Sequence, residues 1–427
     1  MEANLVLFED SRWRDLRPLT EVLPVPALAF GASTLAERWV GAAGLPLAAC
    51  IARPHALAAW RDAPRPVLPA GEVLLANAAA LPGAWFDVVR AAPPPAVFES
   101  GGVVVGARLT AGELTPALAG RPIEEALRAL AAPRPIEARR IAWPWDVVAW
   151  NAPAIGEDLA GMAAARAGDV HPQAVLLAPE RIAVLAGARV DPLAVLDARG
   201  GPILIGEGAV VRAHTVVAGP CVVGARTELL SGYVARATFG PDCRIAGEIE
   251  ECVWQGYGNK RHHGFVGHSV IGEWVNLGAL TTTSDLKNNY GAVRVRVGGR
   301  EIDTGVAKLG SLIGAHVKTG IGTLLPTGAS VGTGSNLFAG GRFAPRDLPP
   351  FSWWDGERLE AHRLEAFLAT ARVAMSRRGR ELLPAEETVL RRVFADSGPE
   401  RERQGAGPAP DVAARGASKP GGSGGRS

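Results

Sequence analysis

The stretch from Asn259 to Tyr290, NKRHHGFVGHSVIGEWVNLGALTTTSDLKNNY, concentrates side chains that could do acid–base and binding chemistry. Its histidines matter first, because a neutral imidazole accepts a proton near neutral pH and can activate a nucleophile. Its amides and cations could hold a polar or anionic substrate. These polar residues are Lys260, Arg261, His262, His263, His268, Asn276, Asp285, Lys287, Asn288, Asn289 and Tyr290. We therefore predict that the active site lies here.

Regular repeats flank this stretch and indicate the scaffold that must position it. Aliphatic residues recur every six positions at Ile205, Val211, Val217, Val223 and Leu229. The spacing resumes after shifts at Phe239, Ile245, Phe265, Ile271, Leu277, Ile313, Leu325, Val331 and Leu337. A six-residue period belongs neither to a helix nor to an ordinary strand, and it is typical of a parallel β-helix. Stacked coils of such a solenoid bury these side chains and present polar ones outside.

The residues before the repeats have a different pattern. Short apolar runs at 5–8, 72–76 and 102–106 predict strands, and residues 110–131 have helical spacing. This alternation predicts an α/β domain with a mostly parallel sheet. We expect this domain over residues 1–160, the β-helix over 161–345 and a helical cap over 346–397, with its second helix starting at Pro384. The Gly/Pro/Ser-rich tail, 398–427, should be disordered.

Composition limits the partners and the compartment. The net charge is only +2, from 45 basic and 43 acidic residues, so neither nucleic acid nor a membrane is expected as a partner. Cys50, Cys221, Cys243 and Cys252 form no CxxC pair, which predicts buried, reduced thiols. The start does not read as a signal peptide, and no apolar run approaches the ~20 residues that cross a bilayer. We expect a cytoplasmic protein.

Several motifs together resemble the bacterial bifunctional enzymes that make UDP-N-acetylglucosamine, and in particular their variant with a shortened N-terminal domain. The motifs are KRHHGFVGHSVIG, EWVNLG and NNYG, with weaker matches at PLTEVLPVPALAFG and WPWDVVAWN. The resemblance implies an α/β, Rossmann-like nucleotidyltransferase domain followed by a left-handed parallel β-helix with C-terminal helices. It also implies a homotrimer whose active sites form between chains, and acetyl transfer from acetyl-CoA to glucosamine-1-phosphate.

The resemblance assigns roles to residues in the central stretch. His262 matches the catalytic histidine, Asn276 a sugar-contacting asparagine, and Asn289 with Tyr290 the region beside both substrates. Phe265 stands where the family has tyrosine, and Lys287 is a further candidate substrate contact whose role stays open. Ser311, Ala329, Lys308 and Lys318 are expected along the acetyl-CoA channel. Histidine and asparagine are also common at solenoid corners without any role, since asparagine tolerates left-handed backbone. His263 and His268 fit that simpler interpretation.

The nucleotidyltransferase-like domain lacks parts that its resemblance calls for. The loop FEDSRWRDLRPLT has no glycine to cradle a triphosphate, and Val25 follows Pro24 where the family has lysine. Arg14 and Arg17 could still bind phosphate, and Asn77 stands nearest to the expected metal-binding aspartate. Transfer from UTP or dTTP with Mg²⁺ therefore stays an open possibility beside a degenerate domain. The rival hypotheses are acyl transfer to another amino sugar and a non-catalytic scaffold that binds sugar nucleotides.

Overall fold

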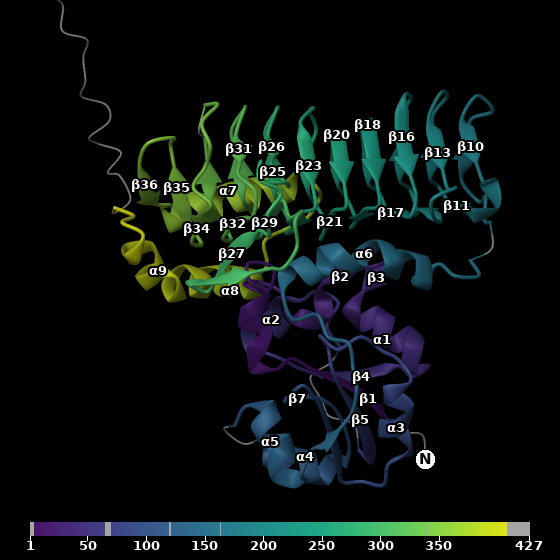
Figure 1. The fold of residues 1–427 in the computed structure, drawn as a ribbon, viewed down its shortest axis with the longest axis vertical. Coiled ribbons are helices and arrows are strands. Elements are labelled where there is room, and N and C mark those ends of the chain that lie inside the picture. The colour runs from purple at the N-terminus through teal and green to yellow at the C-terminus, as the bar shows by residue number, and fades with distance from the viewer. Residues whose placement is uncertain (1–3, 65–69, 119–120, 163, 339, 408–427) are drawn as a thin grey trace, which may run out of the picture.

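A computed structural model describes residues 4–64, 70–118, 121–162, 164–338 and 340–407. A long β-solenoid lies across one end of a compact α/β domain, and helices from the C-terminus pack along the solenoid (Figure 1). Among the described residues, no helix combines the length and apolar character needed to cross a bilayer. The four cysteines are buried and free, as predicted.

The N-terminal domain is built on one sheet with the strand order β4-β1-β5-β7-β6-β8. Its strands are β1 (Asn4–Phe8), β2 (Ala29–Phe30), β3 (Ser33–Thr34), β4 (Leu47–Ile51), β5 (Glu72–Asn77), β6 (Ala96–Ser100), β7 (Val103–Thr110) and β8 (Arg134–Pro135). Its helices are α1 (Leu35–Ala43), α2 (Pro54–Ala59), α3 (Trp85–Ala91), α4 (Ala111–Ala117), α5 (Ile123–Leu130) and α6 (Pro144–Asp158). The predicted strands are thus present.

Two details of this domain differ from the prediction. The sheet is mostly parallel, as predicted, but it contains one reversed strand, because β7 runs antiparallel to both β5 and β6. This follows from a tight connection, Gly101 and Gly102 at positive φ, which turns β6 directly into β7. The predicted helix over 110–131 is divided into α4 and α5, and Pro122 precedes the second.

The solenoid winds through three faces, and its strands pair in parallel from coil to coil. One face consists of β11 (Ile182–Val184), β14 (Ile203–Ile205), β17 (Cys221–Val223), β19 (Thr238–Phe239), β21 (Val253–Trp254), β24 (Val270–Ile271), β29 (Ser311–Ile313), β32 (Ala329–Val331) and β34 (Asp347–Leu348). The other faces use β9 (Asp169–Val170), β10 (Val175–Leu177), β12 (Arg189–Val190), β13 (Val195–Asp197), β15 (Val210–Val211), β16 (Thr215–Ala218), β18 (Glu228–Ala235), β20 (Arg244–Glu250), β22 (Asn259–Lys260), β23 (Phe265–Gly267), β25 (Asn276–Leu277), β26 (Thr282–Thr283), β30 (Lys318–Thr319), β31 (Leu324–Leu325), β33 (Asn336–Leu337), β35 (Ser352–Trp354) and the antiparallel β36 (Leu359–Ala361).

The hexapeptide pattern predicts the solenoid core with one exception. Residues such as Ile205, Leu229 and Leu337 form one buried cluster along the solenoid axis. Phe265 does not join it; its neighbour Val266 is buried there instead. The coils also continue past residue 345, since Leu348 and Trp354 still fill the core.

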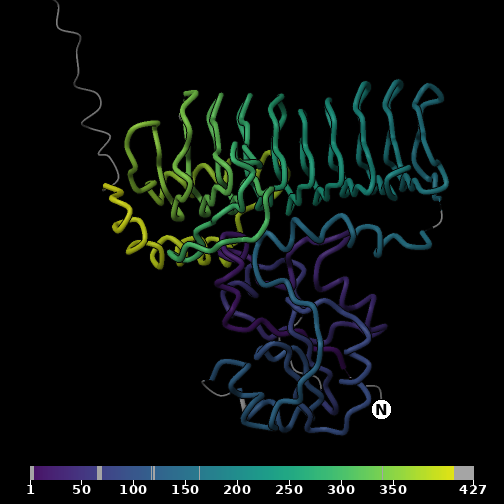
Figure 2. The backbone as a smooth tube through the Cα atoms, in the orientation of Figure 1, coloured from purple at the N-terminus to yellow at the C-terminus, as the bar shows by residue number. Residues whose placement is uncertain are grey.

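The two domains share a core. Val253, Val270 and Leu312, from strands β21, β24 and β29, belong to the same buried cluster as the N-terminal domain. A hairpin of β27 (Arg294–Val297) and β28 (Arg300–Asp303) leaves the solenoid and lies against that domain, where Val295 and Val297 join the cluster (Figure 2). The two parts therefore pack as one body.

The C-terminal helices are α7 (Leu364–Ser376), α8 (Pro384–Asp396) and α9 (Gly398–Arg403). Pro384 starts α8, as predicted. The expectation of disorder from residue 398 is wrong for residues 398–407, because Arg401 is buried and donates to the Pro350 carbonyl at 2.9 Å. The rest of that tail, 408–427, lies outside the described residues.

Candidate functional site

The central stretch forms one turn of the solenoid and the start of the next. β22 leads through a corner at His262 and His263 to β23, and a second corner at His268 leads to β24. Lys260 ends β22 and is fully buried, although lysine is almost never buried without partners. Its Nζ donates to the carbonyl oxygens of His262 and His263, the latter at 2.8 Å. Burial lowers the pKa of Lys260 to about 8. The side chain of Lys260 therefore holds the backbone of the first corner in place.

His262 lies on the exposed side of that corner. Its imidazole makes no hydrogen bond or ion pair with the part of the chain that the structure describes. His263 is exposed as well, and its carbonyl accepts a hydrogen bond from Leu280 of the next coil at 2.8 Å. The ring of His262 is thus open to a substrate.

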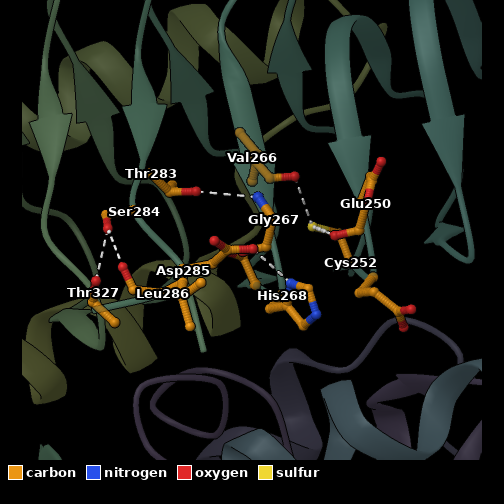
Figure 3. Close-up of polar contacts among 12 residues, drawn as sticks. Glu250, Cys252, Val266, Gly267, His268, Thr283, Ser284, Asp285, Leu286 and Thr327 are labelled. Carbon is orange, nitrogen blue, oxygen red and sulfur yellow. Dashed lines mark hydrogen bonds and ion pairs between the residues drawn. The ribbon is translucent and has the colours of Figure 1, made fainter. Parts of the chain in front are cut away.

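His268, at the second corner, has a partner that the sequence reasoning missed. Its Nδ1 lies 2.7 Å from Oδ2 of Asp285, on the following coil (Figure 3). A carboxylate can only accept, so Nδ1 donates to Asp285, and whenever the ring is neutral its lone pair is on Nε2. The hydrogen bond from His268 lowers the pKa of Asp285 below its ordinary value. An oriented imidazole of this kind is a second candidate base.

Gly267 makes room for this pair. A Cβ at position 267 would lie 2.7 Å from Oδ2 of Asp285 and 2.4 Å from the ring of Phe265. Phe265 lies half-buried on the outside of β23, so it remains available as a contact in an acceptor pocket. The backbone of Gly267 is held by a hydrogen bond from its N–H to Thr283 Oγ1 at 3.1 Å (Figure 3).

A row of polar side chains runs along β22, β25, β30 and β33, the set of strands that we call the α7 face. Asn259, Asn276, Lys318 and Asn336 are register neighbours in this row. Nδ2 of Asn259 donates to Oδ1 of Asn276 at 2.7 Å. Asn276 and Lys318, both predicted from sequence, line one cavity of about 620 Å³ between this face and α7.

The remaining predicted acyltransfer residues lie apart from this row. Asn289 and Tyr290 are exposed on the loop after β26, and Tyr290 is 74% exposed. Lys287, on the same loop, is half-buried and donates to the Ala292 carbonyl. Lys308 is exposed where that excursion returns to the solenoid. A single chain therefore does not bring His262, Asn276 and Asn289 onto one face.

Two of the residues expected along the acetyl-CoA channel face inward. Ser311 and Ala329 are neighbours in register on β29 and β32, and both are fully buried. Ala329 belongs to the solenoid core. Their side chains therefore do not reach a ligand on the surface of this chain.

In the N-terminal domain, the carboxyl ends of β1 and β5 meet at one edge of the sheet, which is where such sheets bind ligands. Nδ2 of Asn77 donates to Oδ2 of Asp10 at 2.9 Å, and Oδ1 of Asp10 accepts from the Arg12 N–H at 3.0 Å. The Ser11 N–H donates to Glu124 Oε1 at 3.1 Å. Burial raises the pKa of Asp10 above its ordinary value. Carboxylates thus occupy loop N–H groups that would otherwise face a phosphate.

The two predicted arginines of this loop diverge. Arg14 is exposed, and its guanidinium lies 4.8 Å from the centre of the Trp13 ring. Arg17 is half-buried and lines a small cavity at the solenoid with Asp347 and Glu400. The structure therefore does not gather Arg14, Arg17 and Asn77 into one site.

The length of one solenoid coil is a sequence signal that could have identified the His268–Asp285 pair. Asn259 and Asn276 are 17 residues apart and bonded, and so are His268 and Asp285. One coil has that length in this region, so a carboxylate 17 positions after a histidine falls at the same corner. Two cations that line the cavity from the turn after α7, Arg377 and Arg378, have no such signal because they lie outside the repeats.

Comparisons with known proteins match segments of this chain. Residues 5–167 match a family model described as sugar nucleotidyl transferase. A bifunctional sugar-1-phosphate nucleotidylyltransferase/acetyltransferase of Sulfurisphaera tokodaii is 38% identical over 93 residues, 22% of this chain and 23% of that protein. The bifunctional protein GlmU of Methanococcus vannielii is 31% identical over 135 residues, 32% of this chain and 28% of that protein. The matched segments thus span less than a third of either relative.

A solved structure of a UDP-N-acetylglucosamine acyltransferase from Campylobacter jejuni covers 54% of this chain and 83% of its own, with 14% identity and a TM-score of 0.25. Residues 5–167 thus match a sugar nucleotidyl transferase domain, and the chain shares shorter segments with two bifunctional relatives.

Proposed function

We propose that the protein transfers the acetyl group of acetyl-CoA to the amine of an amino-sugar 1-phosphate, with glucosamine-1-phosphate as the first candidate. One observation carries this proposal: a sugar nucleotidyl transferase domain is joined to a solenoid bearing His262, Asn276 and Lys318. A relative with both activities in its description supports the same combination.

The chemistry requires a base, because an amine at neutral pH is largely an ammonium ion. In the proposed step, His262 takes a proton as the nitrogen attacks the thioester carbonyl. The tetrahedral intermediate then collapses, the C–S bond breaks, and the thiolate of CoA leaves and is protonated. The open ring of His262 suits this role, since a substrate amine could reach it directly. Asn276 would hold the sugar through its amide.

We propose a homotrimer in which a neighbouring chain completes the site. Support comes from the corner next to His262, where Leu280 is 59% exposed and Ile321 is 72% exposed. Apolar side chains in such a position favour an interface over water. A neighbour at this corner could supply Asn289 and Tyr290, which the single chain leaves on a different corner.

The direct test measures thiol release from acetyl-CoA with glucosamine-1-phosphate and a panel of other amino-sugar phosphates. We expect turnover, and we expect His262→Ala to lower it by roughly 100-fold or more. His263→Ala is the matched control, because His263 is also exposed and lies one residue away. Turnover only with a different amino sugar would change the acceptor. No turnover with any acceptor would favour a scaffold that binds sugar nucleotides.

Nucleotidyl transfer is a second candidate function, supported by the match over residues 5–167. If Mg²⁺ takes part, Glu124 would hold it, because its Oε2 is buried without a partner beside the loop after β1. Mg²⁺ is often bound by one carboxylate together with phosphates and water, and there it would neutralise charge on the triphosphate. Release of pyrophosphate from UTP or dTTP with a sugar phosphate tests this. Silence across nucleotides and divalent metals would mark the domain as structural.

A further inference from the structure

The cavity between the α7 face and helix α7 is lined by cations from two separate parts of the chain. Arg261 and Lys318 come from the solenoid, and Arg377 and Arg378 come from the turn that follows α7. No carboxylate is among the described residues that line it. We propose that this cavity binds the diphosphate group of a ligand.

These cations lack the partners that they would normally have. None of the four forms an ion pair within the described chain, and Nε of Arg378 is buried without any hydrogen bond. Asp242 lies near Arg378 but is already bonded to Arg226 at 2.7 Å. Burial lowers the pKa of Lys318 to about 8, since no carboxylate offsets its lost hydration. Converging unpaired cations of this kind are stabilised by a bound anion.

The size and the neutral groups of the cavity select the ligand class. A volume of about 620 Å³ exceeds what one phosphate requires and falls in the usual range for small-molecule sites. Asn276 uses Oδ1 to accept from Asn259, which leaves its amide N–H groups free to donate. Arg377 and Arg378, with planar guanidinium groups, can each bind phosphate oxygens in pairs. A diphosphate with an attached organic group matches this set better than a single phosphate.

Packing fixes α7 in this position. Phe367, Leu368 and Ala371 form a buried cluster with Phe351 of the last coils, and Phe367 contacts His316 edge-on at 5.7 Å. The helix therefore holds its C-terminal arginines over the solenoid strands. Cations at a helix C-terminus also interact favourably with the helix dipole, so their clustering there is tolerated without acids.

Two diphosphate sources are to be distinguished. The diphosphate of CoA would place its thioester arm along the α7 face beside Asn276, an assignment that rests on the proposed acetyl transfer. A nucleotide sugar would present the same group without a thiol. The proposal that the cavity binds a diphosphate group is the same for both ligands.

The test is calorimetric titration of the full chain with pyrophosphate, CoA, UDP-N-acetylglucosamine and glucosamine-1-phosphate. We expect pyrophosphate and one diphosphate-bearing molecule to bind, and we expect Arg377→Gln/Arg378→Gln to weaken both by about tenfold or more. Lys318→Gln should weaken them from the solenoid side. Arg363→Gln is the control, because Arg363 is exposed at the other end of α7 and outside the cavity. Thermal unfolding of each variant reports its folding.

Equal affinities in the wild type and the double variant would overturn the site, and so would an equal loss in Arg363→Gln. Binding of glucosamine-1-phosphate alone would overturn the diphosphate assignment. Acetyl transfer is measured in parallel, so that the two proposals fail separately. If the wild type catalyses acetyl transfer but the double variant binds diphosphate unchanged, the diphosphate site is contradicted and the proposed function stands. If the double variant loses binding but the wild type shows no acetyl transfer, the site stands and the proposed function is contradicted.

Discussion

His262 and His268 lie on successive corners of one solenoid turn, and the protein secures them by opposite means. At the first corner, buried Lys260 holds the backbone carbonyls of His262 and His263, and the His262 ring is left free. At the second corner, Asp285 holds the ring of His268 itself.

The two histidines show that resemblance to a sequence motif and hydrogen-bond geometry can favour different residues as the candidate base. The motif selects His262, whose ring has no hydrogen bond within the described residues to orient it. The geometry selects His268, whose proton position is already set by a carboxylate. Under the proposed function a substrate or a neighbouring chain orients the ring of His262, whereas Asp285 already orients the ring of His268.

Exchanging each histidine in turn gives the largest expected contrast. We expect His262→Gln to lower acetyl transfer by roughly 100-fold or more, and His268→Gln to lower it by less than about tenfold. Initial rates of thiol release at saturating acetyl-CoA measure both. Glutamine keeps a polar side chain at each corner, and the unfolding temperatures of the variants report whether each corner stays folded. The reverse ranking would move the base to His268 and would end the case for His262.

Loss of Lys260 should have the next largest effect. In Lys260→Met the carbonyls of His262 and His263 lose their donor, so we expect about tenfold slower acetyl transfer and faster amide exchange over residues 261–264. A normal rate together with faster exchange would mean that the corner need not be fixed for catalysis. Arg261→Met, one residue along and exposed, is a control for exchange at the corner, since it leaves the Lys260 bonds intact.

The same variant has a signature in the pH dependence of stability. The pKa of Lys260 is about 8 in the folded chain, against an ordinary 10.5. Between these values the unfolded chain binds more protons than the folded one, so the free energy of unfolding should rise with pH across that window. Lys260→Met should lose this part of the slope, which approaches one proton. Denaturant titrations at several pH values measure it, and identical slopes would show that Lys260 titrates normally.

The sequence predicted those parts of the molecule that repeat and missed those that pair across repeats. Leu229, Ile271 and Leu337 were identifiable as core because each coil buries the same positions. The His268–Asp285 pair follows only from the local coil length of 17 residues, which the six-residue period alone does not give. The β27–β28 hairpin was not predicted, because its apolar side chains serve the N-terminal domain and not the solenoid. Arg377 and Arg378 reach their cavity only through tertiary packing of α7.

Neutralising Asp285 should have the smallest effect, and it separates a structural corner from a catalytic one. Because the folded-state pKa of Asp285 lies below the ordinary 3.8, its stabilising contribution is present above that pH and is lost as the pH falls through the folded value. Asp285→Asn should therefore lower the free energy of unfolding by about 1 kcal/mol at neutral pH, and by less in acid. Denaturant titration measures this, with Asp169→Asn on an exposed strand of the first coil as the control.

Acetyl transfer by Asp285→Asn should change by less than about threefold, since asparagine can still accept from Nδ1 of His268 and only the charge is lost. A loss near the ~10⁴-fold seen when a catalytic histidine loses its carboxylate would instead identify His268 and Asp285 as the working pair. The open ring at His262 would then need another explanation.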